Sequence, residues 1–476
     1  MSTQDWRNRR VLILGAARQG KALARYLIAH GARVALNDIQ PCAKLDLSDL
    51  ADLNLLMMEA SALPEGSIWQ ALPTGASVLV CGGHPLSLLN DCELVCVSGG
   101  VPLDLPIVQA ARARSIPLSN DAQLFFEACP APIIGITGSA GKTTTTALVG
   151  EMLKAAGRVT WVGGNIGNPL ITEVERIQPT DAVVMELSSF QLELMTRSPH
   201  IACVTNITPN HLDRHGTMEA YIAAKQRILD FQSAEDWCVL SADNAVTAAL
   251  PARARKVWFS LRPLAKHCQG AWMDERGGLW VRIGDTHELI CHRSALKLMG
   301  EHNVANVLAA AAISILAGAP IDAVRQVAAT FRGVAHRLEL IAERNGVRWY
   351  DDSIATTPER LIAALRCFEG QSVILLCGGR DKHLPWEEAA QRMRAQCKAV
   401  VCFGEMAPMV AEHLARVPGK AQWIVVPALR EAVLVADALA QPGDVVLLSP
   451  GGTSFDAFKD FAERGERFRQ WVNELP

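Results

Sequence analysis

The strongest constraint on the fold is a pattern that occurs three times: a short apolar run, then a glycine-rich turn, then a helical stretch. The runs and their turns are residues 11–14 with GAARQG (15–20), residues 133–136 with TGSAGKT (137–143), and residues 373–376 with CGGRDK (377–382). This alternation is typical of parallel sheets whose strands are joined by crossover helices. In open sheets of this kind, ligands bind beyond the carboxyl ends of the strands. The pattern therefore predicts an α/β protein with three ligand-binding domains.

The length of the chain agrees with three domains. A chain of 476 residues holds three domains of ordinary size, at roughly 100–200 residues each. Polar stretches at residues 119–121 and 332–333 are the candidate boundaries. We predict domains at residues 1–120, 121–333 and 334–476.

Composition narrows the functional class. The net charge of −3 gives no bulk electrostatic attraction for nucleic acid, and no basic cluster compensates for it. No run of about 18 apolar residues is present, and from the polar start of the chain we expect no signal peptide. The 13 cysteines are scattered without a CxxC pair, which indicates reduced thiols, most of them packed as small apolar residues. We expect a soluble cytoplasmic protein with no nucleic-acid or membrane partner.

The turn at residues 137–143 carries the clearest chemical signal. A strand, a glycine-rich turn and a helix that starts near Lys142 would direct backbone N–H groups and a positive helix end at phosphates. Lys142 would contact the β- and γ-phosphates, and the Thr143 hydroxyl would bind magnesium. The spacing departs from the strict P-loop pattern, because Ile136 stands where the first glycine is expected. The alternative is a tight turn that contains Gly-Lys-Thr by chance. We predict a nucleotide site.

Four further residues could complete that site, and each also has a plainer explanation. Glu186 ends an apolar strand, where it could bind magnesium or merely be exposed. His211 lies in a loop after the next strand and could contact metal or phosphate, or be structural. Lys225 alone would be taken for a surface lysine. Asn303 precedes a helix expected over residues 304–316, where it could be an N-cap or a nucleotide contact.

Taken together, these segments resemble the Mur ligase superfamily. The matching motifs are TGSAGKTT (137–144), GGNIG (163–167), ELSSF (186–190), HLDR (211–214), AAK (223–225), GEHN (300–303), HR (336–337), DDS (351–353), GG (378–379) and LSPGGTSF (448–455). Within the superfamily, ELSSFQ (186–191), SFDAFKDF (454–461) and ERG (463–465) are similar to the glutamate-adding members. The motifs occur in order over nearly the whole chain.

The resemblance implies a fold and a reaction. The fold would be the three-domain Mur ligase architecture: a Rossmann-like N-terminal domain for a UDP-sugar, a central P-loop ATPase-like domain, and a Rossmann-like C-terminal domain for glutamate. The reaction would be ATP-dependent amide-bond formation through an acyl phosphate, in peptidoglycan precursor synthesis. It would add D-glutamate, or alternatively L-glutamate, to UDP-N-acetylmuramoyl-L-alanine. ATP and Mg²⁺ are the implied cofactors, and we expect a monomer.

The resemblance also assigns residues to the central and C-terminal sites. The catalytic residues would be Lys142, Glu186, His211 and Lys225. The metal ligands would be Thr143, Glu186, His211 and a carbamylated Lys225. The ATP-binding residues would be Gly138, Ser139, Ala140, Gly141, Lys142, Thr143, Thr144, Asn303, Arg337 and Asp352. The glutamate-binding residues would be Thr356, Lys382, Ser454, Phe455 and Phe461.

The N-terminal turn is similar to a dinucleotide-binding fingerprint, with Asp38 at the end of the next strand. Ala17 replaces the middle glycine, so close approach of a pyrophosphate is less favoured. A Rossmann-like turn without a ligand is the plain alternative. The resemblance instead implies a UDP-sugar pocket formed by Gly15, Arg18, Gly20, Asp38, Ser98, Gly99, Gly100 and Asn165.

One departure from the family pattern bears on substrate binding. Ile354 stands where the family usually has lysine, so Lys382 would carry more of the positive charge near glutamate. Three rival functions stay open. They are another ligase of the superfamily that resembles folylpolyglutamate synthase, a nicotinamide-dependent dehydrogenase that uses residues 15–20, and a P-loop switch without ligase activity.

Overall fold

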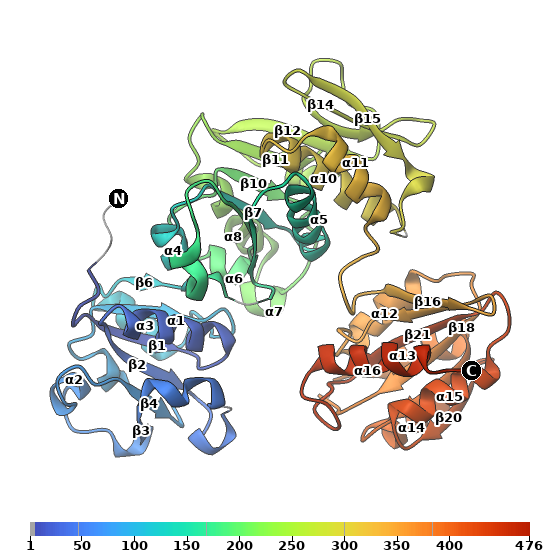
Figure 1. Cartoon of the computed structure of the whole chain (residues 1–476). Coiled ribbons are helices and arrows are strands. Elements are labelled where there is room, and N and C mark those ends of the chain that lie inside the picture. Colours follow the sequence, from blue (N-terminus) through green and yellow to red (C-terminus); the bar gives the residue numbers. More distant parts are fainter. Residues whose placement is uncertain (1–4, 46, 168, 299, 383) are drawn as a thin grey trace. The chain divides into compact units, whose positions relative to one another are not determined.

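The computed structural model describes residues 5–45, 47–167, 169–298, 300–382 and 384–476 (Figure 1). The chain forms two compact units, one of residues 1–296 with 301–329 and the other of residues 297–300 with 330–476. Three sheets lie in the described ranges, two in the first unit and one in the second. None of the helices in these ranges is long and apolar enough to cross a bilayer. The predicted α/β class is confirmed, whereas the assignment of three ligands to three domains stays a prediction.

The N-terminal sheet is entirely parallel, with strand order β3-β4-β2-β1-β5-β6. Its strands are β1 (Arg10–Leu14), β2 (Arg33–Asp38), β3 (Leu56–Glu59), β4 (Val78–Cys81), β5 (Leu94–Val97) and β6 (Leu118–Ser119). The helices are α1 (Arg18–Ala29), α2 (Ile68–Ala71), α3 (Pro106–Ala113) and α4 (Asp121–Ala128). Alternate residues of β1 enter two different cores, Val11 and Ile13 on one face and Leu12 and Leu14 on the other. Burial on both faces explains why the strand is a continuous apolar run.

A disulfide joins Cys42 to Cys81 in this sheet. The prediction of reduced thiols is therefore wrong for this pair. Cys81 ends β4 opposite Asp38 of β2, and Cys42 begins the short 3₁₀ helix η1 (Cys42–Lys44) that follows β2. The sheet thus brings the two Cα atoms to 5.3 Å, within bridging distance. Most of the free cysteines in the described ranges are buried, as expected.

The central sheet has the order β15-β14-β13-β12-β11-β10-β7-β9-β8, parallel except where β14 pairs with β13 and β15. Its strands are β7 (Ile133–Thr137), β8 (Thr160–Gly164), β9 (Ala182–Glu186), β10 (Ile201–Val204), β11 (Trp237–Ser241), β12 (Arg255–Ser260), β13 (Gly270–Met273), β14 (Gly278–Ile283) and β15 (Thr286–His292). The helices are α5 (Lys142–Ala155), α6 (Ser189–Leu192), α7 (Leu212–His215), α8 (Met218–Asp230), α9 (Ala245–Ala248), α10 (Glu301–Leu316) and α11 (Ile321–Thr330). Because α10 begins at Glu301, Asn303 lies inside its first turn, and the N-cap alternative for Asn303 is wrong.

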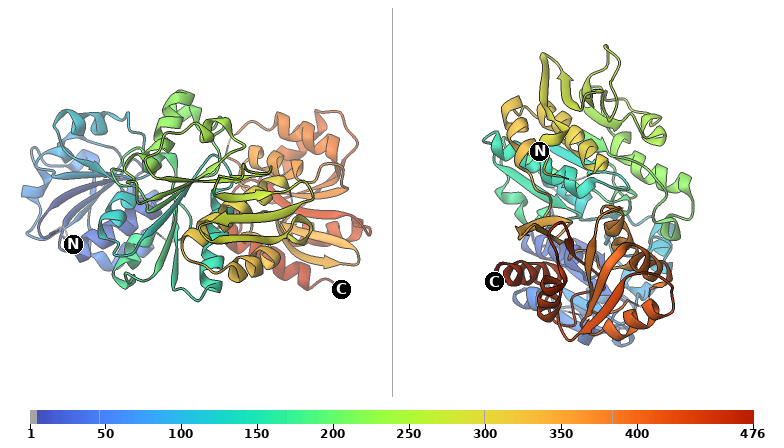
Figure 2. Two further views of the ribbon diagram at one scale, coloured as in Figure 1. Left: turned by 90° about the horizontal axis from the view of Figure 1, so that it is seen from above. Right: turned by 90° about the vertical axis from the view of Figure 1, so that its right-hand side faces the viewer.

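The C-terminal sheet has the order β16-β17-β21-β18-β19-β20, with only the edge strand β16 antiparallel among the described strands. Its strands are β16 (Glu339–Arg344), β17 (Val347–Asp351), β18 (Val373–Gly378), β19 (Cys397–Phe403), β20 (Gln422–Val426) and β21 (Val445–Gly451). The helices are α12 (Pro358–Arg366), α13 (Glu387–Gln396), α14 (Ala407–Ala415), α15 (Leu429–Leu439) and α16 (Phe461–Asn473). Helices cover both faces of the sheet, and a separate apolar core lies on each face (Figure 2).

Candidate active site

The loop between β7 and α5 is shaped by two glycines. Gly138 and Gly141 have φ angles of 152° and 81°, which favour glycine. A Cβ atom on Gly138 would lie 1.9 Å from Oγ1 of Thr205, and one on Gly141 would lie 2.3 Å from Oδ1 of Asn306. The loop is therefore pressed between the end of β10 and helix α10. Its chain then enters α5 at Lys142 as predicted, so that the first-turn N–H groups of α5 face the loop.

Lys142 lies over this loop. Its Nζ donates to the carbonyl oxygen of Gly138 at 2.9 Å and to that of Ser139 at 3.4 Å. Ser139 and Ala140 are held from the other side, because their N–H groups donate to the backbone and side-chain oxygens of Asn206. The predicted loop residues are thus brought together around one concave turn.

Glu186 is bound by two side chains, one in the first turn of α5 and one directly after β8. Oγ1 of Thr143 donates to Oε2 of Glu186 at 2.7 Å, and Nδ2 of Asn165 donates to Oε1 at 2.9 Å. The carboxylate is 2% exposed, so the alternative of a merely exposed strand-end glutamate is wrong. Gly164 pairs with Glu186 in the sheet, and a Cβ there would lie 2.4 Å from the carbonyl oxygen of Glu186. A buried hydroxyl and a buried carboxylate side by side are the oxygen donors that Mg²⁺ prefers.

Lys225 lies inside the protein, not on its surface. It is 1% exposed, and its Nζ donates to the carbonyl oxygen of Gly138 at 2.9 Å. Burial lowers the pKa of Lys225 well below its usual value, the charge of Lys142 lowers it further, and Glu186 opposes both. The reading of Lys225 as a surface lysine is wrong. An uncharged amine in this place is a nucleophile.

His211 follows β10 and caps the one-turn helix α7. Its φ angle of 53° is in the left-handed region, which is uncommon for histidine. Its ring lies 5.3 Å from that of Phe190, which follows Glu186 by four residues. The His211 loop thus reaches the same edge of the sheet as Glu186.

The predicted UDP-sugar residues gather at the carboxyl ends of β1, β2 and β5. Oδ2 of Asp38 accepts the N–H of Ala16 at 2.8 Å, and Oγ of Ser98 donates to the carbonyl oxygen of Gly15 at 3.2 Å. A Cβ on Gly20 would lie 1.8 Å from that same carbonyl, so α1 packs tightly against the turn. Gly99 and Gly100 follow Ser98 in the next turn.

Asn165 connects this turn to the phosphate loop. Its carbonyl oxygen accepts from Nη2 of Arg18 at 3.3 Å, while its amide donates to Glu186. One residue therefore contacts both predicted sites.

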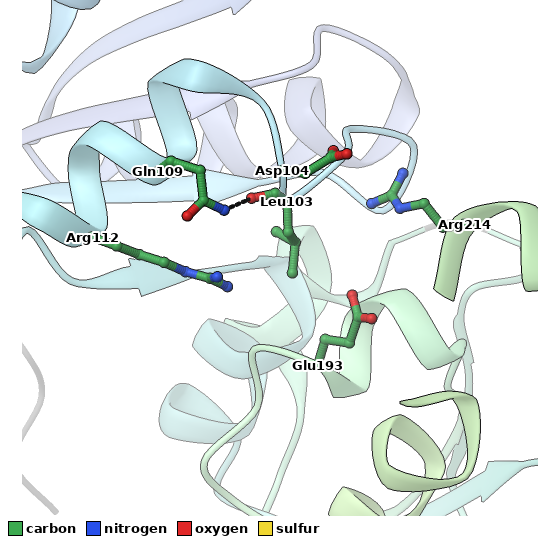
Figure 3. Close-up of a pocket in the computed structure, with 6 residues that line it drawn as sticks. All are labelled: Leu103, Asp104, Gln109, Arg112, Glu193 and Arg214. Carbon is green, nitrogen blue, oxygen red and sulfur yellow. Dashed lines mark hydrogen bonds between the residues drawn. The ribbon is translucent and has the colours of Figure 1, made fainter. Parts of the chain in front are cut away.

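Two cavities lie in the first unit. The larger, of about 390 Å³, is lined by Leu103, Asp104, Gln109, Arg112, Glu193 and Arg214 (Figure 3). The smaller, of about 240 Å³, is lined by Arg18, Lys21, Ala22, Arg25, Asp49, Leu50, Pro169 and Thr172. Arg18 is the predicted site residue among them.

Asp352 is buried directly after β17 in the second unit. Its Oδ1 accepts the N–H of Leu338 and its Oδ2 accepts the hydroxyl of Ser449. Burial raises the pKa of Asp352 to about 7, although Ser449 and the charge of Arg337 work against the rise. The structure therefore brings Asp352 and Arg337 together.

The predicted glutamate residues lie at the carboxyl edge of the same sheet. Nζ of Lys382 donates to Oγ1 of Thr356 at 3.3 Å. Ser454 is buried just beyond β21, Phe461 begins α16, and Phe455 is 61% exposed. The loops that carry these residues follow β17, β18 and β21, which are neighbouring strands.

Arg464, which the sequence identifies only as part of the ERG motif, is buried and joins two of these loops. Its guanidinium donates to Oγ and O of Ser353 and to the carbonyl oxygen of Gly452. Burial lowers the pKa of Arg464 to about 10, so it stays charged at neutral pH. The ERG motif was a signal for it, but the motif alone names no partner.

His336, Glu339 and Asp351 form a cluster with ligand-type atoms within 4.8 Å of one another. His336 lies 2.7 Å from Asp351, and Arg469 lies 2.8 Å from Glu339. Because Arg469 pairs with Glu339, the cluster is part of an ion-pair network.

Two family models cover most of the chain beyond the first sheet. Residues 136–314 match the Mur ligase middle domain, and residues 336–452 match the Mur ligase glutamate ligase domain. A relative from Symbiobacterium thermophilum is 43% identical over 471 residues, 98% of each chain. The chain belongs to the Mur ligase family. Mur ligases are ATP-dependent enzymes that form carbon–nitrogen bonds, so the dehydrogenase and P-loop switch alternatives are wrong.

The names of the relatives agree with one another. The protein from Symbiobacterium thermophilum is named UDP-N-acetylmuramoylalanine–D-glutamate ligase. One from Pelotomaculum thermopropionicum has the same name and is 40% identical over 476 residues, 99% of each chain.

Solved Mur ligases share the fold of this Mur ligase. The alanine ligase MurC from Thermotoga maritima superposes with a TM-score of 0.54 at 20% identity, over 98% of this chain and 99% of that one. MurF from Acinetobacter baumannii gives 0.56 at 16% identity, over 97% and 93%. The predicted fold class is confirmed.

Proposed function

We propose that this Mur ligase joins D-glutamate to UDP-N-acetylmuramoyl-L-alanine, with conversion of ATP to ADP and phosphate, in peptidoglycan precursor synthesis. The names of relatives that are 40–43% identical over nearly the full length support the substrates. The observation that carries the proposal is the bonded set Thr143–Glu186–Asn165, beside Lys142. In this set a residue at the start of α5 donates to a carboxylate, and Asn165 also accepts a hydrogen bond from Arg18 of the N-terminal turn.

The reaction needs the alanine carboxylate to become an electrophile. A carboxylate oxygen attacks the γ-phosphorus of ATP, the bond to the β-γ bridging oxygen breaks, and an acyl phosphate forms. The amine of glutamate, having lost its proton, then attacks the acyl carbon, and phosphate leaves. Phosphoryl transfer is mainly positioning and charge stabilisation. In the proposed reaction, Lys142 and the first-turn N–H groups of α5 would supply both.

The donor set fits magnesium. Thr143 and Glu186 offer a hydroxyl and a carboxylate, and Mg²⁺ also takes phosphate oxygens and water. When bound, Mg²⁺ would neutralise charge on the β- and γ-phosphates. We propose Thr143, Glu186, His211 and a carbamylated Lys225 as its ligands. The lowered pKa of Lys225 supports the last, because only the uncharged amine attacks carbon dioxide; the new N–C bond forms and a proton leaves.

The other predicted site residues would bind the three substrates. Asn303, Arg337 and Asp352 would bind ATP, and Thr356, Lys382, Ser454, Phe455 and Phe461 would bind glutamate. Gly15, Arg18, Gly20, Asp38, Ser98, Gly99, Gly100 and Asn165 would bind the UDP-sugar. We propose that the three domains of residues 1–120, 121–333 and 334–476 divide the three substrates in this way, in a cytoplasmic monomer.

Phosphate release tests the proposal. Purified protein should release phosphate only with ATP, UDP-N-acetylmuramoyl-L-alanine and D-glutamate together, and mass spectrometry should show the new amide. Equal rates with L-glutamate would overturn the stereochemistry, and preference for a folate acceptor would favour a folylpolyglutamate synthase-like enzyme.

A pair of lysine variants tests the role of the loop. Lys142→Ala should abolish turnover and leave UDP-sugar binding largely intact. Lys154→Ala is the matched control, since Lys154 lies in the last turn of the same helix and pairs with the surface residue Glu151. If Lys142→Ala loses turnover and UDP-sugar binding to the same extent, the proposed separation of the ATP site from the UDP-sugar site is wrong.

A further inference from the structure

The helix that begins directly after His211 is too short to be stable by itself. Helix α7 is one turn long, and a single turn has no intrinsic stability. It lies between two residues with positive φ angles, His211 at 53° and Gly216 at 76°. Side-chain contacts must therefore fix its position, and with it the ring of His211.

His215 supplies the buried contact. Its side chain is 0% exposed, and its Nε2 lies 2.9 Å from Oγ of Ser189 in α6. Nδ1 lies 3.0 Å from Oε1 of Glu193. A carboxylate beside Nδ1 favours the proton on that nitrogen, which leaves Nε2 to accept the Ser189 hydroxyl.

Two aromatic rings also contact the ring of His215. Its ring stacks on Phe190 with centroids 5.3 Å apart and planes 9° apart, and Tyr221 lies 5.1 Å away. Phe190 also contacts the ring of His211. One short segment, residues 186–193, thus begins with Glu186 and then supplies Ser189, Phe190 and Glu193.

The outer side of α7 is held by Arg214. Its Nη2 donates to the carbonyl oxygen of Val101 at 2.5 Å, and its guanidinium lies 4.9 Å from the Phe190 ring. Arg214 and Glu193 border the cavity shown in Figure 3, and His215 is not among the residues that line it. Arg214 therefore faces the cavity, and His215 is the contact inside the protein.

Ser189, His215 and Glu193 lie in the order of a hydrolase triad, but burial excludes that role. Ser189 is 3% exposed and His215 is 0% exposed, so an acyl substrate has no access to the hydroxyl. We infer that His215 is a positioning residue: by binding Ser189, it fixes α7 and so holds His211 in register with Glu186. The inference rests on the proposed metal-binding function of these two residues.

Metal binding tests the inference without turnover. The probe is Mn²⁺, titrated by electron paramagnetic resonance in the presence of ADP. His215→Leu should weaken Mn²⁺ binding about 10-fold, the usual effect of removing a group that orients a metal ligand. His215→Gln keeps an acceptor for Ser189 and should recover most of the affinity. His200→Leu is the matched control, because His200 pairs with Asp236 at the amino end of β10 and should leave the affinity unchanged.

Activity and folding measurements separate the outcomes. His215→Leu should also raise the Mg²⁺ concentration for half-maximal activity about 10-fold, with the KM for glutamate unchanged. If it does not fold, Ser189→Ala removes the same bond and should shift Mn²⁺ affinity in the same direction. If a folded variant binds Mn²⁺ as tightly as the active wild-type protein does, the inference about His215 is wrong and the proposed function is unaffected. Wild-type protein that forms no ADP overturns the proposed function and the inference together.

Discussion

Oγ1 of Thr143 donates a 2.7 Å hydrogen bond to Oε2 of Glu186, across 43 residues of sequence. The two residues follow or end neighbouring parallel strands, β7 and β9, whose carboxyl ends meet at one edge of the central sheet. The buried Thr143 hydroxyl and Glu186 carboxylate therefore lie together, and Thr143 follows Lys142 in the chain. Most of the proposed chemistry depends on this pair of groups.

Removing the charge of Glu186 should disable phosphoryl transfer. Glu186→Gln keeps the shape but loses an anionic oxygen donor, so kcat should fall about 100-fold. Phosphate release at varied Mg²⁺ concentration measures the effect. Glu173→Gln is the control, because Glu173 pairs with Arg176 outside the site. Full activity in Glu186→Gln would show that its carboxylate holds no metal.

The phosphate loop should reject a methyl group at Gly141 for reasons of space. Gly141 and Gly157 have nearly equal φ angles, 81° and 79°, so alanine costs about 1–2 kcal/mol of backbone strain at either. Only at Gly141 would the Cβ meet a neighbour, Oδ1 of Asn306 at 2.3 Å, since nothing lies within 4 Å at Gly157. Gly141→Ala should raise the KM for ATP, and Gly157→Ala should not.

A second substitution checks that explanation. Adding Asn306→Ala to Gly141→Ala removes the clashing atom and should restore part of the ATP affinity. If the double variant is no better than Gly141→Ala, the clash is not the cause.

Arg360 should share the work of binding glutamate. Its Nη1 donates to the carbonyl oxygen of Ile354 at 3.1 Å, where the family pattern has a lysine side chain. Burial, and then the charge of Arg360, lower the pKa of Lys382, so the two cations face one region. Arg360→Ala and Lys382→Ala should each raise the KM for D-glutamate about 10-fold, the loss of one charge-assisted hydrogen bond.

A matched arginine in the same helix provides the control. Arg366 ends α12 and lies 3.7 Å from Glu388, so Arg366→Ala should leave the KM unchanged. Equal effects at Arg360 and Arg366 would mean that the helix is only being destabilised.

Asp352 should make the stability of the C-terminal unit fall as pH rises. Its pKa is about 7 in the folded protein and about 3.9 in an unfolded chain, so the folded state binds the extra proton between these values. The stabilising contribution is therefore complete below pH ~4 and is lost as pH rises through ~7, by at most about 4 kcal/mol. Asp352→Asn should flatten this slope in urea denaturation between pH 5 and pH 8 without substrates. A slope that persists in the variant would assign it to other groups.

Features encoded within one strand–turn–helix unit could be predicted from the sequence. Lys142 begins α5 as expected, and the strand ending at Glu186 brings its carboxylate to the loop, because parallel neighbours end at the same edge. The three glycine-rich turns all follow strands. These outcomes depend on local turn chemistry and on alternation of apolar runs.

Features that depend on packing between distant segments could not be predicted. Asn306 contacts Thr145 across 161 residues, and Arg464 contacts Ser353 across 111. The disulfide joins cysteines 39 residues apart with no spacing motif. The burial of Lys225 could not be predicted for the same reason, since it arises only in the folded chain.

In the proposed reaction, the acceptor carboxylate gives one of its oxygens to phosphate. The direct test uses UDP-N-acetylmuramoyl-L-alanine labelled with ¹⁸O in the alanine carboxylate, with ATP and D-glutamate. We expect the released phosphate to carry one labelled oxygen for each amide formed. Unlabelled phosphate beside a labelled carboxylate pool would contradict it.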